Sequence, residues 1–128
     1  MQSKYEKKVE SLLMGRCIYK KEVIMPNLYG YKNHPLRFDF GIYLPNGKLY
    51  CLIEVDGEFH FHESMGKLKY IKQKGYDEKK NAYCLARNIY LIRIPYWEVQ
   101  DLTYDKIFQI PYFVVKSKFH NSFLKPPN

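Results

Sequence analysis

Three carboxylates stand inside two stretches of mostly apolar residues. Asp39 lies in Leu36–Leu44 (LRFDFGIYL), and Glu54 and Asp56 lie in Lys48–Asp56 (KLYCLIEVD). Carboxylates are rarely buried unless they are paired or bind a metal ion. Glu54 and Asp56 are two residues apart, so in a β-strand their side chains project from the same face. Because carboxylate oxygens are the ligands that Mg²⁺ prefers, these three residues are candidate metal ligands.

The register of the two stretches decides whether these carboxylates meet. Pro45–Gly47 separates the stretches and is typical of a β-hairpin turn. A two-residue turn at Asn46-Gly47 would place Asp39 directly opposite Glu54, with Cβ atoms roughly 4.5–5.5 Å apart. Like charges so close destabilise a hairpin, so this register predicts a cation between them, such as Mg²⁺.

A different turn would change this prediction. If the loop holds three residues, Pro45 included, and ends in a bulge, the pairing shifts by one residue. Asp39 and Glu54 would then lie on opposite faces of the hairpin. In the two-residue register Asp56 faces Arg37, and a salt bridge between them explains Asp56 as well as a metal role does. No basic residue is obviously opposed to the other two carboxylates.

Further candidates follow along the chain. His60, within Glu58–His62 (EFHFH), can bind metal, donate to a phosphate or act as a general base, although a lone histidine is also typical of a polar surface. Tyr76–Asn88 predicts a helix with one stripe of side chains: Asp77, Lys80, Cys84 and Arg87. This stripe is either an ordinary solvated face or a basic face that contacts phosphates, with Asp77 orienting a histidine or a water molecule.

The composition limits the class of protein. The chain has 128 residues, which predicts one domain over residues 1–128, with an unassigned tail from about residue 112. Its 21 Lys and Arg residues against 13 Asp and Glu residues give a net charge of +8, which favours an anionic partner such as nucleic acid. No apolar run is long enough for a membrane span or a signal peptide, so we expect a cytoplasmic protein. Three widely spaced cysteines predict reduced, mostly buried thiols.

The elements that must position these side chains can also be predicted. Ser3–Met14 has the apolar spacing of a helix, Arg16–Met25 predicts an edge strand, and Ile89–Ile94 predicts a buried strand. The remaining segments are a loop over Pro26–Pro35, a loop or frayed helix over Gly57–Gly75 and a short helix over Asp101–Gln109. With the hairpin, this order predicts an α/β fold in which helices pack on a mixed sheet.

Four of these segments together resemble one enzyme family. They are Leu36–Phe40 (LRFDF), Ile53–Phe61 (IEVDGEFHF), Asp77-x-x-Lys80-Asn81 and Ile89–Pro95 (IYLIRIP), and the family is the PD-(D/E)XK nuclease superfamily. More narrowly, they are similar to the branch of very-short-patch-repair-like and phage or intron-encoded homing endonucleases. The resemblance covers about half of the chain. It implies a restriction-endonuclease-like fold, with a mixed central sheet and flanking helices.

The resemblance also implies roles for the candidate catalytic residues. Asp39 and Glu54 would bind the metal ion, and Asp56 would support them or stand where the family usually has a lysine. His60 and Asp77 would match the histidine and the aspartate of this branch.

Two further sets of residues follow from the resemblance and from the basic stripe. Lys80, Arg87 and Arg37 are the candidates for contacts with nucleic acid. An acidic residue of the first helix often joins such sites, which leaves Glu6 and Glu10. Glu10 is preferred because it is nearer to the entry of the first strand.

The expected function is therefore a metal-dependent DNA endonuclease, which hydrolyses phosphodiester bonds with Mg²⁺, or Mn²⁺ as a substitute, in a bacterial or phage-infected cell. The usual Glu-x-Lys of the family is Glu54-Val55-Asp56 here, so the role of the lysine falls to His60 or Lys80. The alternatives are a catalytically inactive nuclease-like module that binds DNA or protein, such as a phage regulator, and an RNA-directed nuclease. A chain of this length leaves little room for choosing a cut site, so specificity is expected to need a homodimer, a recruiting protein or recognition of DNA shape.

Overall fold

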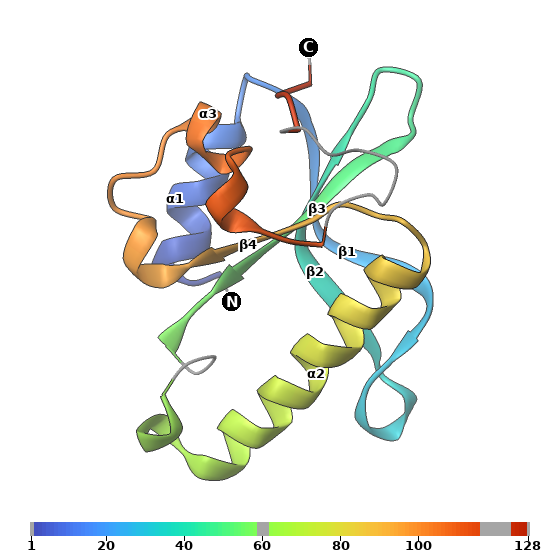
Figure 1. Cartoon of the computed structure of the whole chain (residues 1–128), viewed down its shortest axis with the longest axis vertical. Coiled ribbons are helices and arrows are strands. Elements are labelled where there is room, and N and C mark those ends of the chain that lie inside the picture. The colour runs from blue at the N-terminus through green and yellow to red at the C-terminus, as the bar shows by residue number, and fades with distance from the viewer. Residues whose placement is uncertain (1, 59–61, 116–123, 128) are drawn as a thin grey trace.

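A mixed sheet runs through the middle of the molecule (Figure 1). The computed structural model describes residues 2–58, 62–115 and 124–127. Within these residues five strands lie side by side in chain order: β1 (Ile18–Tyr29), β2 (Pro35–Tyr43), β3 (Leu49–Asp56), β4 (Leu91–Pro95) and β5 (Phe113–Val115). The β1–β2, β2–β3 and β4–β5 pairs are antiparallel, whereas β3 and β4 are parallel.

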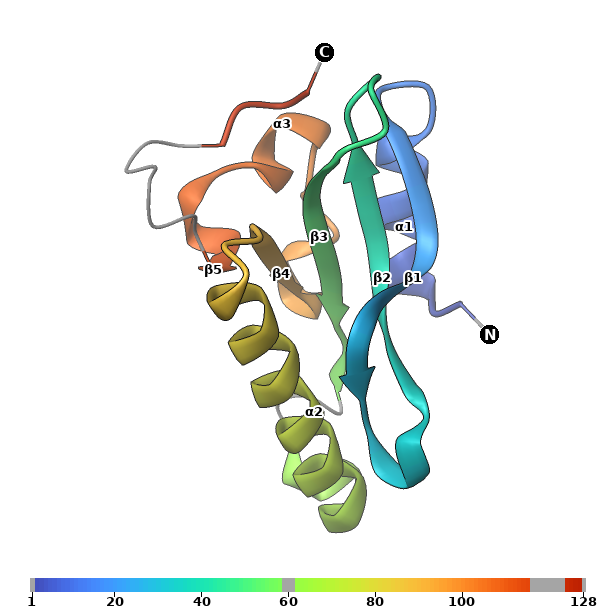
Figure 2. The ribbon, with the colours of Figure 1, turned by 90° about the vertical axis from the view of Figure 1, so that its right-hand side faces the viewer.

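Helices cover both faces of this sheet (Figure 2). The helix α2 (Lys67–Ala86) packs on one face, where the buried core includes Phe38, Leu52, Tyr83, Cys84 and Leu91. The helices α1 (Lys4–Leu13) and α3 (Tyr104–Ile107) cover the other face, where the buried core includes Val9, Leu13, Phe40, Ile53 and Ile107. The predicted α/β fold, with helices flanking a mixed sheet, is confirmed at this level.

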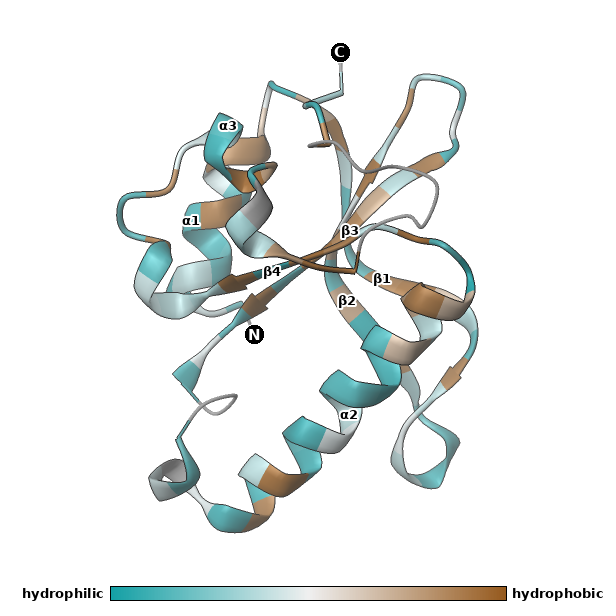
Figure 3. Ribbon diagram, viewed as in Figure 1, coloured by the Kyte–Doolittle hydropathy of each residue, from teal (hydrophilic) through white to brown (hydrophobic). Residues whose placement is uncertain are grey.

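The predicted bounds hold for α1 and fail at the start of α2. The Ser3 hydroxyl accepts a hydrogen bond from the Glu6 N–H at 3.1 Å, which is how an N-cap residue begins a helix. The helix α2 begins at Lys67, inside the segment expected to be a loop or a frayed helix. Its first half extends beyond the sheet and leaves Leu68 83% exposed, so no apolar periodicity marks it (Figure 1). Most of this helix is hydrophilic (Figure 3).

The strand β1 is longer than its sequence pattern indicates. Its place at the end of the sheet confirms the predicted edge strand. It continues past Pro26 to Tyr29, so the expected loop over Pro26–Pro35 shrinks to a short tip. Proline is tolerated there because an edge strand has N–H positions that face no partner strand.

The C-terminal third follows the predicted order with shorter elements. The buried strand β4 ends at Pro95, whereas the expected helix over Asp101–Gln109 is the single turn α3. Part of the unassigned tail forms β5, and residues 116–123 lie outside the described residues. The cysteines are free thiols, and Cys51 and Cys84 are buried, as expected. Among the described helices, none has both the length and the apolar character that crossing a membrane requires.

Candidate active site

The turn of the β2–β3 hairpin holds three residues rather than two. The Leu44 N–H donates to the Lys48 carbonyl at 2.8 Å, and the Gly47 N–H donates to the Leu44 carbonyl at 2.9 Å. Gly47 takes a φ of 87°, a left-handed conformation that glycine adopts without steric cost. This is the loop-and-bulge turn, so the two-residue turn at Asn46-Gly47 is wrong.

A second irregularity restores the register at the candidate site. The strand β3 holds one extra residue, Tyr50, between two successive pairs of the ladder: Tyr43 with Leu49 and Ile42 with Cys51. This bulge shifts the pairing by one residue and cancels the shift that the turn introduces. The ladder then runs to Phe40 opposite Ile53, and Asp39 meets Glu54 as predicted.

Asp39 and Glu54 are fixed by backbone donors at the end of this ladder. The Asp39 N–H donates to Glu54 Oε1 at 2.9 Å, and the Val55 N–H donates to Asp39 Oδ2 at 2.7 Å. The two carboxylates thus act as the acceptors that backbone carbonyls provide elsewhere in the sheet. Glu54 is buried and Asp39 is half-buried. The hydrogen bonds that hold these two side chains in position therefore come from β2 and β3 alone.

Lys80 of α2 supplies a positive charge beside Glu54. Its Nζ lies 2.9 Å from Glu54 Oε2, and the residue is only 7% exposed. The Phe38 ring lies beneath it, with 5.4 Å between Nζ and the ring centroid. Because a buried charge requires a partner, each member of this pair accounts for the burial of the other.

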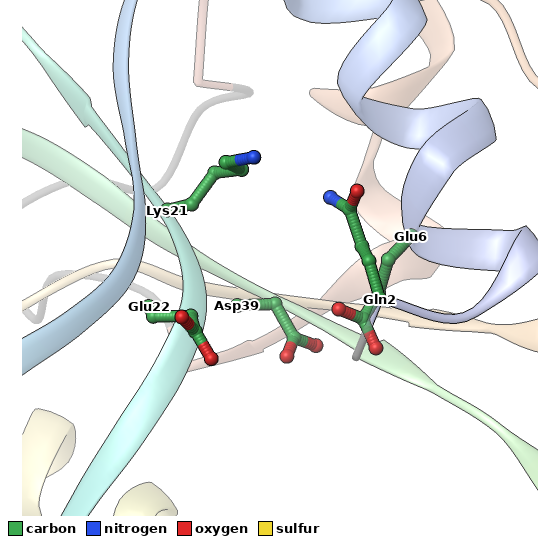
Figure 4. Close-up of a pocket in the computed structure, with 5 residues that line it drawn as sticks. All are labelled: Gln2, Glu6, Lys21, Glu22 and Asp39. Atoms are coloured by element: carbon green, nitrogen blue, oxygen red, sulfur yellow. The ribbon is translucent and has the colours of Figure 1, made fainter.

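Two further carboxylates, which come from α1 and β1, border the space in front of Asp39. Glu6 and Glu22 approach the Asp39 carboxyl from opposite sides (Figure 4). They line a pocket of about 200 Å³ together with Gln2 and Lys21. A second pocket, of about 510 Å³, is bordered by Glu6, Asp39, Glu54 and Lys80. Asp39 and Glu6 therefore stand between two neighbouring pockets.

The surroundings of Asp39 favour its protonated form. Loss of hydration is the largest cause, and the negative charge of Glu54 is the second; together they raise the pKa of Asp39 to about 8. Glu6 acts in the same direction, whereas the Val55 N–H and Lys80 act against it. At neutral pH the carboxyl group therefore holds a proton, which a divalent cation would displace.

Asp56 belongs to a separate cluster on the α2 side of the sheet. Glu54, Asp56 and Asp77 offer carboxylate oxygens within 4.8 Å of one another. The guanidinium of Arg93 lies among them, with Nη1 2.8 Å from Asp56, 3.4 Å from Asp77 and 3.9 Å from Glu54. Arg93 Nε also donates to Asn81 Oδ1 at 3.0 Å. The guanidinium supplies the positive charge that this cluster needs.

The cross-strand partner expected for Asp56 is therefore wrong. Arg37 is exposed on β2 and opposes Ile24 of β1, whereas Arg93 of β4 pairs with Asp56. Arg93 was part of a recognised motif, but no role was predicted for it. A basic residue inside the apolar stretch Ile89–Pro95 is the same kind of signal as the carboxylates in β2 and β3.

The two glutamates of α1 lie in different surroundings. Glu10 accepts from the Tyr19 hydroxyl at 2.8 Å and from Gln2 at 3.1 Å, and it lies 3.6 Å from Lys21 Nζ. These bonds lower the pKa of Glu10, the Tyr19 bond most. Glu6, one turn earlier, borders both pockets beside Asp39.

The helix stripe is mostly buried or half-buried and exposed only at Arg87. Lys80 and Cys84 are buried toward the sheet and Asp77 is half-buried, so the stripe is not a solvated face. Arg87 is exposed, and its guanidinium lies 3.7 Å from the centroid of the Tyr83 ring. The prediction for His60 falls outside the described residues.

Carboxylates gather at two places in the described part of the chain, beside Asp39 and around Asp56. Asp39, Glu54 and Glu6 line one pocket, and loss of hydration together with the charge of Glu54 raises the pKa of Asp39. The cluster at Asp56 has its own cation in Arg93. No signal in the sequence singles out Glu22, since its side chain reaches the pocket through a left-handed φ of 50°. Comparisons of this chain with protein-family models, curated proteins and solved structures found no match.

Proposed function

We propose that the chain is a Mg²⁺-dependent DNA endonuclease with a restriction-endonuclease-like fold. The observation that carries this proposal is the meeting of Asp39 and Glu54 at the end of the β2–β3 ladder, with Lys80 paired to Glu54. Phosphodiester hydrolysis requires carboxylates that bind a divalent ion and a positive charge near the phosphate. This arrangement offers both within one pocket.

The residues of the site would have separate roles in the reaction. Asp39, Glu54 and Glu6 would hold the ion, whose chemistry when bound is to stabilise negative charge on the phosphate and to activate water. Asp39 would have to release its proton to act as a ligand of the ion. Lys80 orients Glu54 through the 2.9 Å contact, and it borders the pocket that the phosphate would enter.

Lys80 also explains the absence of a lysine from Glu54-Val55-Asp56. Glu54 and Lys80, which are 26 positions apart in the sequence, meet here because α2 packs its Lys80 side chain against β3. A positive charge therefore stands beside the metal-binding carboxylates, although it comes from the helix and not from the strand. Asp56, at the position of the usual lysine, is paired with Arg93 instead.

Cleavage of DNA is expected to require both Mg²⁺ and the two central carboxylates. Asp39→Asn and Glu54→Gln should each lower the rate by roughly 100-fold or more, since a metal ligand contributes several kcal/mol to the transition state. Plasmid and single-stranded DNA are incubated with the wild type and each variant, with Mg²⁺, Mn²⁺ or EDTA, and the products are separated on gels.

Asp101→Asn serves as the matched control, because Asp101 is an exposed carboxylate on the loop before α3. It should cleave as the wild type does. Tight, salt-sensitive binding of DNA without cleavage in any metal would overturn the proposal in favour of a catalytically inactive binding module. Cleavage of RNA alone would retain the chemistry and change the substrate.

A further inference from the structure

The β1–β2 hairpin ends in a rigid tip beside α2 (Figures 1 and 2). We define the hairpin tip as residues Tyr29–His34. The Gly30 N–H donates to the His34 carbonyl at 2.8 Å, and the His34 N–H donates to the Tyr31 carbonyl at 3.2 Å. Lys32 takes a left-handed φ of 53°. The backbone from Gly30 to His34 is therefore closed into a loop by its own hydrogen bonds.

Side chains of α2 hold the backbone of this hairpin in place. The Tyr31 N–H donates to the Tyr76 hydroxyl at 3.3 Å, and Lys79 Nζ donates to the Tyr29 carbonyl at 2.8 Å. A Cβ on Gly30 would lie 2.7 Å from the side chain of Leu36 and 2.9 Å from the Tyr76 ring, so only glycine allows this close approach. The hairpin tip is therefore preorganised by contacts that involve no ligand.

The surface that the hairpin tip presents is aromatic and basic. Tyr31 is 64% exposed, although it is a large aromatic side chain. Lys32 Nζ lies 5.5 Å and Lys72 Nζ 5.4 Å from the centroid of its ring. Between Val23 and Phe38 the sequence contains no acidic residue. The hairpin tip and most of α2 are hydrophilic (Figure 3). A surface that binds an apolar partner would instead be hydrophobic.

We infer that the hairpin tip binds an unpaired nucleotide, with the base stacked on Tyr31 and the phosphate contacted by Lys32 and Lys72. An exposed aromatic ring with two ammonium groups near it matches the two recognition elements of single-stranded nucleic acid, a stacking platform and a positive charge for the backbone. Stacking tolerates any base, because every base has a π-face. Holding in place the backbone that carries the ring lowers the entropy lost on binding.

This inference rests on the proposed function and narrows its substrate. The extended strand from Pro35, next to the hairpin tip, to Asp39 of the candidate site spans four residue-to-residue steps. That is roughly 13 Å, or the length of about four stacked nucleotides. The substrate class is then a duplex that carries unpaired nucleotides a few positions from the bond that is cut.

The test compares Tyr31→Leu with the wild type in EDTA, so that binding is measured without cleavage. The ligands are a short blunt DNA duplex and the same duplex with a single-stranded extension, each followed by fluorescence anisotropy. Tyr31→Leu should weaken binding of the extended duplex by about 5- to 150-fold and leave the blunt duplex nearly unchanged. Tyr31→Phe, which retains the ring, should bind like the wild type. A 2-aminopurine in the extension should be quenched by the wild type and not by Tyr31→Leu.

Tyr43→Leu is the matched control, because Tyr43 also lies under a lysine, with Lys20 Nζ 4.9 Å from its ring, at the opposite end of the same hairpin. It should leave the preference for the extension unchanged. Equal loss for Tyr31→Leu and Tyr43→Leu, or equal binding of both duplexes by the wild type, would overturn the inference.

The outcome is distinguishable from the outcome for the proposed function. Extension-dependent binding through Tyr31 with no cleavage in any metal would support the hairpin tip and refute the nuclease. If Tyr31→Leu cleaves both duplexes as the wild type does, the result would support the nuclease and refute the hairpin tip as a nucleotide-binding site. Extensions of DNA and RNA with the same sequence show which sugar is accepted. Competition by poly-glutamate equal to that by single-stranded DNA would show a general polyanion surface and overturn the inference.

Discussion

Replacing Asp39 with asparagine is expected to stabilise the metal-free protein at pH 8. Asparagine keeps an oxygen that can accept from the Val55 N–H, as Asp39 Oδ2 does at 2.7 Å. It carries no charge to be dehydrated beside Glu54 and Glu6. We expect a gain of roughly 2–4 kcal/mol in the free energy of unfolding, since the linkage is worth about 1.4 kcal/mol per pH unit. In a domain of this size each kcal/mol raises Tm by about 3–6 °C.

The gain should depend on pH in one direction. The ordinary pKa of an aspartate is 3.8, and that of folded Asp39 is raised to about 8. Between these values the folded chain binds the proton more tightly than the unfolded chain does. The stabilisation from this proton is full below about pH 4 and is lost as the pH rises through about 8. The stability of the wild type should therefore fall relative to that of Asp39→Asn from pH 5 to pH 8.

Thermal unfolding in EDTA at pH 5, 6.5 and 8 measures this difference, with Asp101→Asn as the exposed control. At pH 8, Mg²⁺ should then stabilise the wild type, by about 2.7 kcal/mol at a hundredfold excess over Kd, and should leave Asp39→Asn nearly unchanged. An Asp39→Asn protein that is less stable than the wild type at pH 8 would mean that the carboxylate serves the fold. The proposed metal site would then lose its main support.

A destabilising carboxylate at this position could be predicted from the sequence, but its geometry could not. The apolar neighbours of Asp39 and Glu54 mark both residues, and the alternation of β3 sets the face of Glu54. Their meeting depends on two shifts that cancel, one at Gly47 and one at Tyr50. Turn chemistry indicates the first of these shifts. Nothing local to Tyr50 indicates the second, because a bulge in mid-strand is decided by packing across the sheet.

The positions of the other side chains of the site could also not be predicted from the sequence. The helical spacing of α1 agrees with the prediction, but that spacing does not indicate that Glu6 lines the pocket with Asp39 while Glu10 binds Tyr19. Lys80 was a candidate because of its position on a predicted helix. That it points inward to Glu54 follows from the packing of α2 on β3, which connects residues 26 positions apart. Glu22 reaches the site through a backbone conformation that glutamate rarely adopts.

Removing the charge of Arg93 is expected to destabilise the protein strongly. Arg93→Met keeps much of the side-chain length and leaves the carboxylates of Glu54, Asp56 and Asp77 without the guanidinium among them. Breaking a buried ion pair from one side costs about 3–5 kcal/mol, a large part of the stability of a typical domain. Urea unfolding in EDTA measures the loss. Arg87→Met is the control, because Arg87 is an exposed arginine at the C-cap of α2 and its replacement should cost about 1 kcal/mol or less.

The Arg93→Met protein also distinguishes two roles of these carboxylates, ion pairing with Arg93 and binding of a metal ion. With the guanidinium gone, three acidic groups within 4.8 Å of one another become a cation site, so Ca²⁺ or Mg²⁺ should recover part of the lost stability. Adding Asp56→Asn to Arg93→Met should abolish this recovery. In the presence of Arg93, however, Asp56→Asn should leave the Mg²⁺-induced gain in stability unchanged, because the ion is expected at Asp39 and Glu54. If Asp56→Asn alone removes that gain, Asp56 is a metal ligand of the wild type and Arg93 is its counter-ion only in the metal-free chain.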